Sequence, residues 1–158
     1  MNCPGVLAYV RFLDQVFAYA DTVDAFLNDE ELLAHWAKYI CILVSGFLEV
    51  ALREILGQYV DAQCSDPNVA NFVRKVLDGA SNPNVDKLLR VTGQFSVEWK
   101  AQLRARLTEE QAAAMNNVIT NRHAIAHGRD CDLTYARIKI DYTHVLAAVE
   151  HLESVCGS

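Results

Sequence analysis

The chain has 158 residues, a length that fits one compact domain with a sizeable core, so we expect a single domain over residues 1–158. Its hydrophobic content of 52% excludes an intrinsically disordered protein. The longest mostly apolar run, Tyr39 to Leu48, is too short to span a bilayer. The formal net charge of −6 argues against a protein that coats nucleic acids broadly.

The charge is unevenly distributed along the chain. Residues 1–66 carry 3 basic and 10 acidic side chains, net −7. Residues 67–106 carry 7 basic and 3 acidic, net +4, and residues 107–158 carry 4 basic and 7 acidic, net −3. The basic middle segment either faces phosphates or forms a solvated helical surface. The five cysteines are odd in number and form no CxxC pair, which is typical of reduced thiols in a cytoplasmic protein.

Helical periodicity dominates the first half of the chain. Apolar residues recur every three to four positions over 5–27 and again over 30–61, which predicts two helices. The middle of the second is apolar nearly all round, so it should be the central core helix. Gly46 within it is either a weak point or a site of close packing.

Capping residues divide the second half into shorter helices. Asp66-Pro67 and Asn82-Pro83 each place a capping residue before proline, which predicts helices near 67–78 and 83–92. A further helix should run from Ser96 to about residue 107.

A capping box at Thr108-Glu109-Glu110-Gln111 begins the next helix, which should reach Ala126 or His127. Gly128 suits the left-handed residue that ends it. The sequence therefore predicts an all-α bundle in which helices 30–61 and 108–127 pack antiparallel.

The last segment supports two interpretations. Residues 135–142 alternate enough to suggest a strand, with Ile138 and Ile140 set against Arg137 and Lys139. A longer apolar stripe at helical spacing continues to Leu152, and it favours a helix capped by Thr134.

The helix that ends at His127 carries an arginine on an apolar stripe, since Met115, Ile119 and Arg122 share one face. A guanidinium there needs an anion or a partly wet cleft. It could find a phosphate, or it could form a structural salt bridge with Glu49 or Glu54 of the central helix.

Two histidines follow this arginine. His127 should lie at the carboxyl end of the helix, where exposed carbonyls favour the protonated imidazole and suit it to general acid–base work or to simple capping. A zinc site at His123, His127 and Cys131 is the chemical rival, but no CxxC, HExxH or acidic cluster completes it. We therefore expect no metal and no other cofactor.

The segment Asn121-Arg122-His123-Ala124-Ile125-Ala126-His127-Gly128 resembles the RxxxxH motif of the HEPN superfamily. Residues 43–53 are similar to the central helix of its RiboL-PSP-HEPN and MAE-type branches, and the likeness covers about residues 30–155. HEPN toxins paired with a nucleotidyltransferase antitoxin usually carry a tyrosine two places after the motif histidine. Arg129 stands there, which disfavours that branch.

The resemblance implies a metal-independent endoribonuclease whose active site is shared across a homodimer. Arg122 would stabilise the phosphate charge and His127 would move protons, with Asn121, His123 and Glu49 in support. The implied partners are a second copy, an RNA substrate and an antitoxin or regulatory protein, as in toxin or defence systems.

Two other functions remain open. The chain could be a non-catalytic HEPN module that binds nucleotide, RNA or a protein partner, which its negative charge fits better. It could also be a helical interaction protein in which Arg122 forms a structural ion pair.

Overall fold

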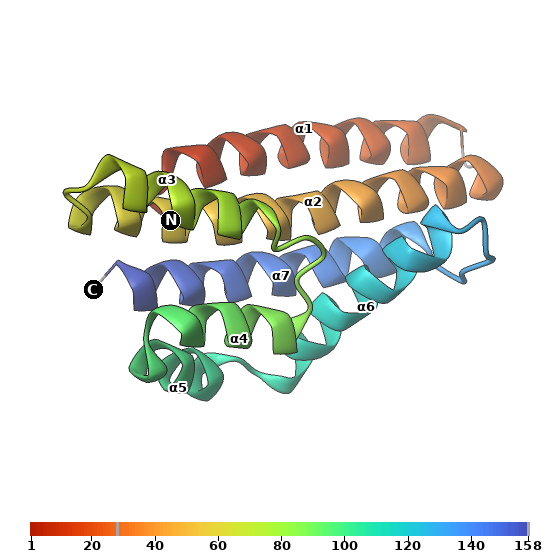
Figure 1. The fold of residues 1–158 in the computed structure, drawn as a ribbon. Helices are drawn as coiled ribbons and strands as arrows, with labels where there is room; N and C mark the ends of the chain where they lie inside the picture. Colours follow the sequence, from red (N-terminus) through yellow and green to blue (C-terminus); the bar gives the residue numbers. More distant parts are fainter. Residues whose placement is uncertain (28, 158) are drawn as a thin grey trace.

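The computed structural model describes residues 1–27 and 29–157, which form seven helices and no strand (Figure 1). The all-α prediction is confirmed. The helices are α1 (Pro4–Leu27), α2 (Glu30–Gln63), α3 (Pro67–Asp78), α4 (Val85–Phe95), α5 (Val97–Arg106), α6 (Glu109–Ala126) and α7 (Tyr135–Cys156).

Most helices begin where the capping residues predict. Asp66 caps α3, with Pro67 in its first turn, and Ser96 caps α5. Thr108 and Gln111 form the expected capping box at the start of α6, in which each side chain accepts a hydrogen bond from the other residue's backbone N–H.

The start of α4 differs from the prediction. Asn84, not Asn82, is its N-cap, and the helix runs from Val85 to Phe95 instead of over 83–92. Asn82 takes a left-handed backbone conformation (φ +47°), and its backbone N–H donates to Oε1 of Glu49 at 2.6 Å. The tertiary contact with α2 therefore overrides the local Asx–Pro signal.

The last segment is the helix α7, and no described residue of 135–142 is in a strand. Thr134 is its N-cap, as predicted, and its hydroxyl accepts a hydrogen bond from the backbone N–H of Arg137 at 3.2 Å. The longer apolar stripe decided the structure because Ile138 and Leu152 are both fully buried.

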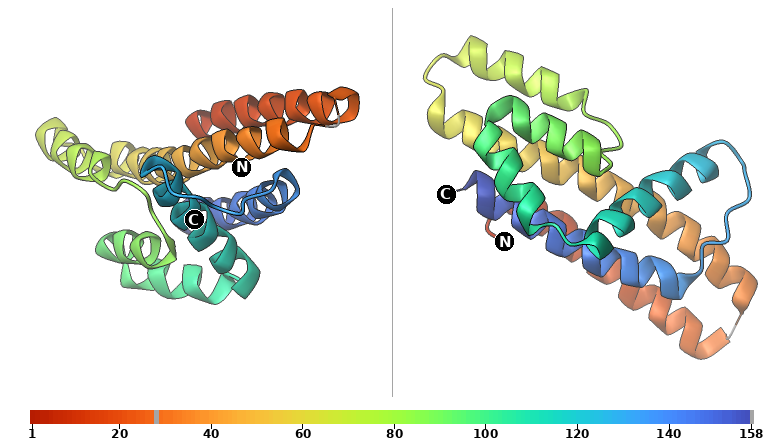
Figure 2. Two further views of the ribbon diagram at one scale, coloured as in Figure 1. Left: turned by 90° about the vertical axis from the view of Figure 1, so that its right-hand side faces the viewer. Right: turned by 90° about the horizontal axis from the view of Figure 1, so that it is seen from below.

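Helix α2 is the centre of the bundle. Figures 1 and 2 show α1 and α7 running alongside it, while α6 runs in the opposite sense to α2 and is inclined across it. Its buried side chains lie mainly on one half of the helix, whereas Tyr39 and Ile42 of the same apolar pattern are exposed. The buried side chains include Ile40, Val44, Phe47, Leu48, Leu52 and Leu56.

Gly46 is a site of close packing. A Cβ added there would lie 2.8 Å from the hydroxyl oxygen of Tyr9, whose O–H donates to the carbonyl of Leu43 at 3.1 Å. The absence of a side chain at Gly46 therefore lets α1 approach α2 closely.

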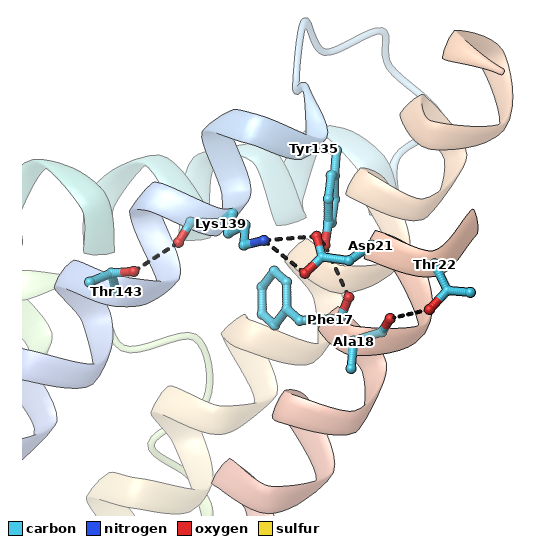
Figure 3. Close-up of polar contacts among 7 residues, drawn as sticks. All are labelled: Phe17, Ala18, Asp21, Thr22, Tyr135, Lys139 and Thr143. Carbon is cyan, nitrogen blue, oxygen red and sulfur yellow. Dashed lines mark hydrogen bonds and ion pairs between the residues drawn. The ribbon is translucent and has the colours of Figure 1, made fainter. Parts of the chain in front are cut away.

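A polar network fixes the first turns of α7 to α1 (Figure 3). The hydroxyl of Tyr135 donates to Oδ1 of Asp21 at 2.7 Å, and Nζ of Lys139 donates to both oxygens of Asp21 at 2.7 and 2.8 Å. Burial alone would raise the pKa of Asp21, but the hydrogen bonds from Lys139 and Tyr135 outweigh it and hold the pKa below its usual value. This network anchors one end of the loop that joins α6 to α7.

None of the helices in the described ranges combines the length and apolarity needed to cross a bilayer.

Candidate functional site

The candidate motif lies on the last turns of α6 and in the residues that end this helix. His127 is the C-cap, and Gly128 follows it in the left-handed conformation (φ +62°) that its position predicts. The backbone N–H of Gly128 donates to the carbonyl of Ile125 at 3.1 Å, and that of Arg129 donates to the carbonyl of Ala124 at 2.9 Å. These two bonds form a Schellman motif, so the end of α6 has one defined geometry.

The two motif histidines are exposed. His123 and His127 both face solvent, one turn apart at the end of α6. The loop that leaves His127 returns to α7 at the end of the bundle where α1 and α2 meet (Figure 1). A ligand can therefore approach both imidazoles without displacing any other part of the described chain.

Arg122 is half-buried, one turn beyond the contact between α6 and α2. That contact is made by Cys41 of α2, whose Sγ lies 3.4 Å from the carbonyl oxygen of Val118. No hydrogen bond or ion pair joins the Arg122 guanidinium to another described residue. The guanidinium is thus partly withdrawn from water yet carries an unused charge, which suits an external anion.

The alternative salt bridge to the central helix is not present. Glu49 accepts a hydrogen bond from the backbone N–H of Asn82. Glu49 also lies near Tyr9, whose pKa is raised mainly by its burial and to a smaller extent by the charge of Glu49. The other carboxylate, Glu54, lies 3.5 Å from Nε of Arg53. Both acids therefore have other partners, and neither forms an ion pair with Arg122.

Asn121 is half-buried and precedes Arg122 on the same turn. Of the five sequence-predicted site residues, the structure brings together four, Asn121, Arg122, His123 and His127, simply because they share the end of one helix. Glu49 belongs to a separate contact that holds the α3–α4 connection against α2.

A comparison with family models matches residues 13–158 to the family RiboL-PSP-HEPN. The match covers well over half of the chain. The chain belongs to the RiboL-PSP-HEPN family. Neither the curated proteins nor the solved structures give a match.

The metal alternative gains no support from the geometry of this HEPN chain. The described residues include no group of three His, Cys, Asp or Glu side chains that could hold a metal ion. Cys131, the third ligand of the hypothetical zinc site, packs against the hydrophobic core. It lies near Cys41, whose pKa is raised to about 12, mainly by burial and to a smaller extent by Cys131 and Asp141.

The sequence reasoning missed one buried carboxylate of this HEPN domain. Asp141 of α7 is only 1% exposed, and its Oδ1 lies 3.1 Å from Nε of Arg137. Burial raises its pKa, and Arg137, Asn117 and His144 offset this only in part. Asn117 comes from α6, one turn before Asn121, so this carboxylate lies where α7 supports the helix that carries the motif.

A signal for Asp141 exists in the sequence. The residue lies between Ile138 and Val145 on the apolar stripe of α7, so an acid there interrupts a face that should be buried.

Proposed function

We propose that this HEPN protein is a metal-independent endoribonuclease, acting as a toxin or defence effector, whose active site is shared by two subunits. The observation that carries the proposal is the end of α6, where a half-buried arginine without an ion pair lies five residues before an exposed histidine. Arg122 suits the phosphate charge and His127 suits proton transfer. Neither side chain makes a hydrogen bond or an ion pair with another described residue.

The proposed chemistry is a transesterification within the RNA. The 2′-oxygen attacks the adjacent phosphorus, its proton passes to one His127 imidazole, and the bond from phosphorus to the 5′-oxygen breaks. A second imidazole gives a proton to that oxygen. The products are a 2′,3′-cyclic phosphate and a 5′-hydroxyl, and no metal or cofactor takes part.

The need for one base and one acid supports a two-fold dimer, because each chain offers one His127. We propose that the carboxyl end of α6 faces its symmetry mate, which would bring together two histidines and two arginines. His123 and Asn121 would support the motif from the same helix end. Glu49 would support it only indirectly, through the α3–α4 connection that it holds.

We also propose that residues 1–158 form one domain located in the cytoplasm. The family match begins at Leu13, within α1, and this helix packs on α2 through Tyr9, before the match. All five cysteines are free thiols, which fits a reducing compartment.

The test is cleavage of mixed RNA by purified protein in the presence of EDTA. We expect His127→Ala to lower the rate by about 10²–10⁴-fold and Arg122→Lys to lower it by about 10²–10³-fold. Lysine keeps the charge but loses the bidentate fork. His35→Ala and Arg11→Lys alter exposed residues of the same types on α2 and α1, and they should leave the rate unchanged.

Subunit mixing tests the shared site. When wild-type protein is diluted with His127→Ala protein at constant total concentration and the subunits exchange, the activity should fall with the square of the wild-type fraction. A linear fall would show that each subunit acts alone. A folded dimer that cleaves no RNA, or that needs added metal, would refute the enzymatic proposal.

The second candidate is a non-catalytic HEPN module that binds nucleotide, RNA or a protein partner. The net charge of −6 favours it, since a strongly acidic protein attracts RNA weakly. Retained binding of RNA or nucleotide by a wild-type protein that never cleaves would support this function, and loss of that binding in Arg122→Lys would locate the ligand at the motif.

A further inference from the structure

Helix α3 presents an apolar stripe that the described chain does not cover. Val69, Phe72 and Val76 recur at a spacing of three and four residues, and they are 50%, 68% and 56% exposed. Leu77 is the one residue of this helix that is fully buried. An amphipathic helix whose apolar face points to water over two turns is typical of a binding surface.

This stripe continues into a groove between α3 and α4. The groove has a volume of about 200 Å³, and Val76 belongs both to it and to the exposed stripe. Figure 2 shows both helices toward the end of the bundle away from the α1–α2 turn. The apolar residues that line the groove include Val73, Val76, Leu77, Val91 and Phe95.

The charged groups of the groove are all basic. Lys87 and Arg90 line it, and no acidic residue does. Arg90 is exposed and makes no ion pair within the described ranges, while Nζ of Lys87 contacts the carbonyl oxygen of Ser81. The surface combines an aliphatic floor with a cationic edge in a protein whose net charge is −6.

These features argue against two occupants. In a two-fold dimer through this surface, both copies of Lys87 and Arg90 would lie in one interface whose groove lining supplies no acid, which like-charge repulsion disfavours. Single-stranded RNA needs a track of cations with stacked aromatic rings, whereas this floor is mainly aliphatic.

We propose that the stripe Val69–Phe72–Val76 and the adjoining α3–α4 groove form a docking surface for an acidic amphipathic helix of a partner protein. The partner's apolar side chains would cover Phe72 and Val76, and its carboxylates would pair with Arg90 and Lys87. The surface involves no motif residue, so the inference goes beyond the proposed function and does not depend on it.

The probe is a fluorescent peptide of about 18 residues, roughly five helical turns, built from Leu, Glu and Ala with Leu on one face and Glu beside it. Fluorescence anisotropy measures its binding to the full chain. One control peptide has the same composition in scrambled order, and another has Lys in place of Glu.

Two substitutions in the surface have matched controls elsewhere. Phe72→Ser and Arg90→Glu should each weaken binding of the acidic peptide on the order of tenfold or more. Val97→Ser removes an apolar side chain that is 72% exposed on α5, and Arg11→Glu reverses an exposed charge on α1; neither should change binding. Added salt should weaken binding of the acidic peptide to the wild-type protein, because salt screens the attraction between charges.

Failure of the acidic peptide to bind, or equal binding by the variants and the controls, would overturn the proposal. So would loss of RNA binding in Phe72→Ser and Arg90→Glu, which would assign the surface to RNA. Self-association that Phe72→Ser abolishes would assign it to a second copy. RNA cleavage by Phe72→Ser should equal that of the wild type, so failure here is distinguishable from failure of the proposed function.

Discussion

Replacing Gly128 with alanine isolates the backbone energy of the turn that ends α6. The residue has a φ of +62°, and an added Cβ would meet no atom within 4 Å, so the substitution introduces no clash. A left-handed alanine costs about 1–2 kcal/mol. Alanine also lowers the conformational entropy of the unfolded chain, which stabilises the folded state by about 0.4–1 kcal/mol. The net loss should be about 1 kcal/mol.

The measurement is urea unfolding followed by far-UV circular dichroism, with thermal unfolding as a second assay. For a domain of this size, about 1 kcal/mol lowers Tm by roughly 2–4 °C. Gly128→Asn is the matched variant, because asparagine tolerates the left-handed conformation better than alanine. A loss of stability for asparagine equal to that for alanine, or no loss for either, would contradict the assignment of strain to this residue.

Three further substitutions test other contacts. Tyr135→Phe removes the hydrogen bond to Asp21 and should lower the free energy of unfolding by about 1 kcal/mol, whereas unchanged urea unfolding would show that the contact contributes nothing. Thr108→Ala removes the capping box of α6 and should also cost about 1 kcal/mol, again by urea unfolding. Asp141→Asn should stabilise the protein at neutral pH. The raised pKa of Asp141 means that the folded state disfavours the ionised carboxyl, so wild-type stability rises as the pH falls through the pKa of the folded state and levels off below the pKa of the unfolded chain. The advantage of asparagine should shrink over the same range, and an advantage independent of pH would refute this explanation.

The sequence predicted the structure correctly where a residue forms its hydrogen bonds with residues close to it in the chain. Thr108 with Gln111, and Gly128 after the last turn, make backbone contacts within a few residues, so the limits of α6 follow from the sequence. The same holds for the motif residues Arg122 and His127, which share one helix end whatever the rest of the chain does.

Contacts between distant residues could not be predicted in this way. Asn82 next to a proline indicates a helix start, yet its backbone binds Glu49, 33 residues away, and the helix begins later at Val85. The same contact gives Glu49 a partner other than Arg122, although the sequence had suggested a salt bridge between these two residues.

The sequence by itself therefore determined that the chain is helical, where most of its helices begin and end, and that Arg122 and His127 lie on one helix. These properties depend on hydrogen bonds and apolar spacing within one or two turns. The tertiary structure decided that Arg122 forms no ion pair with another described residue, that Asp141 is buried and that the stripe on α3 stays exposed. Those properties depend on which helices pack together, because burial and charge pairing are set by neighbours that are remote in the sequence.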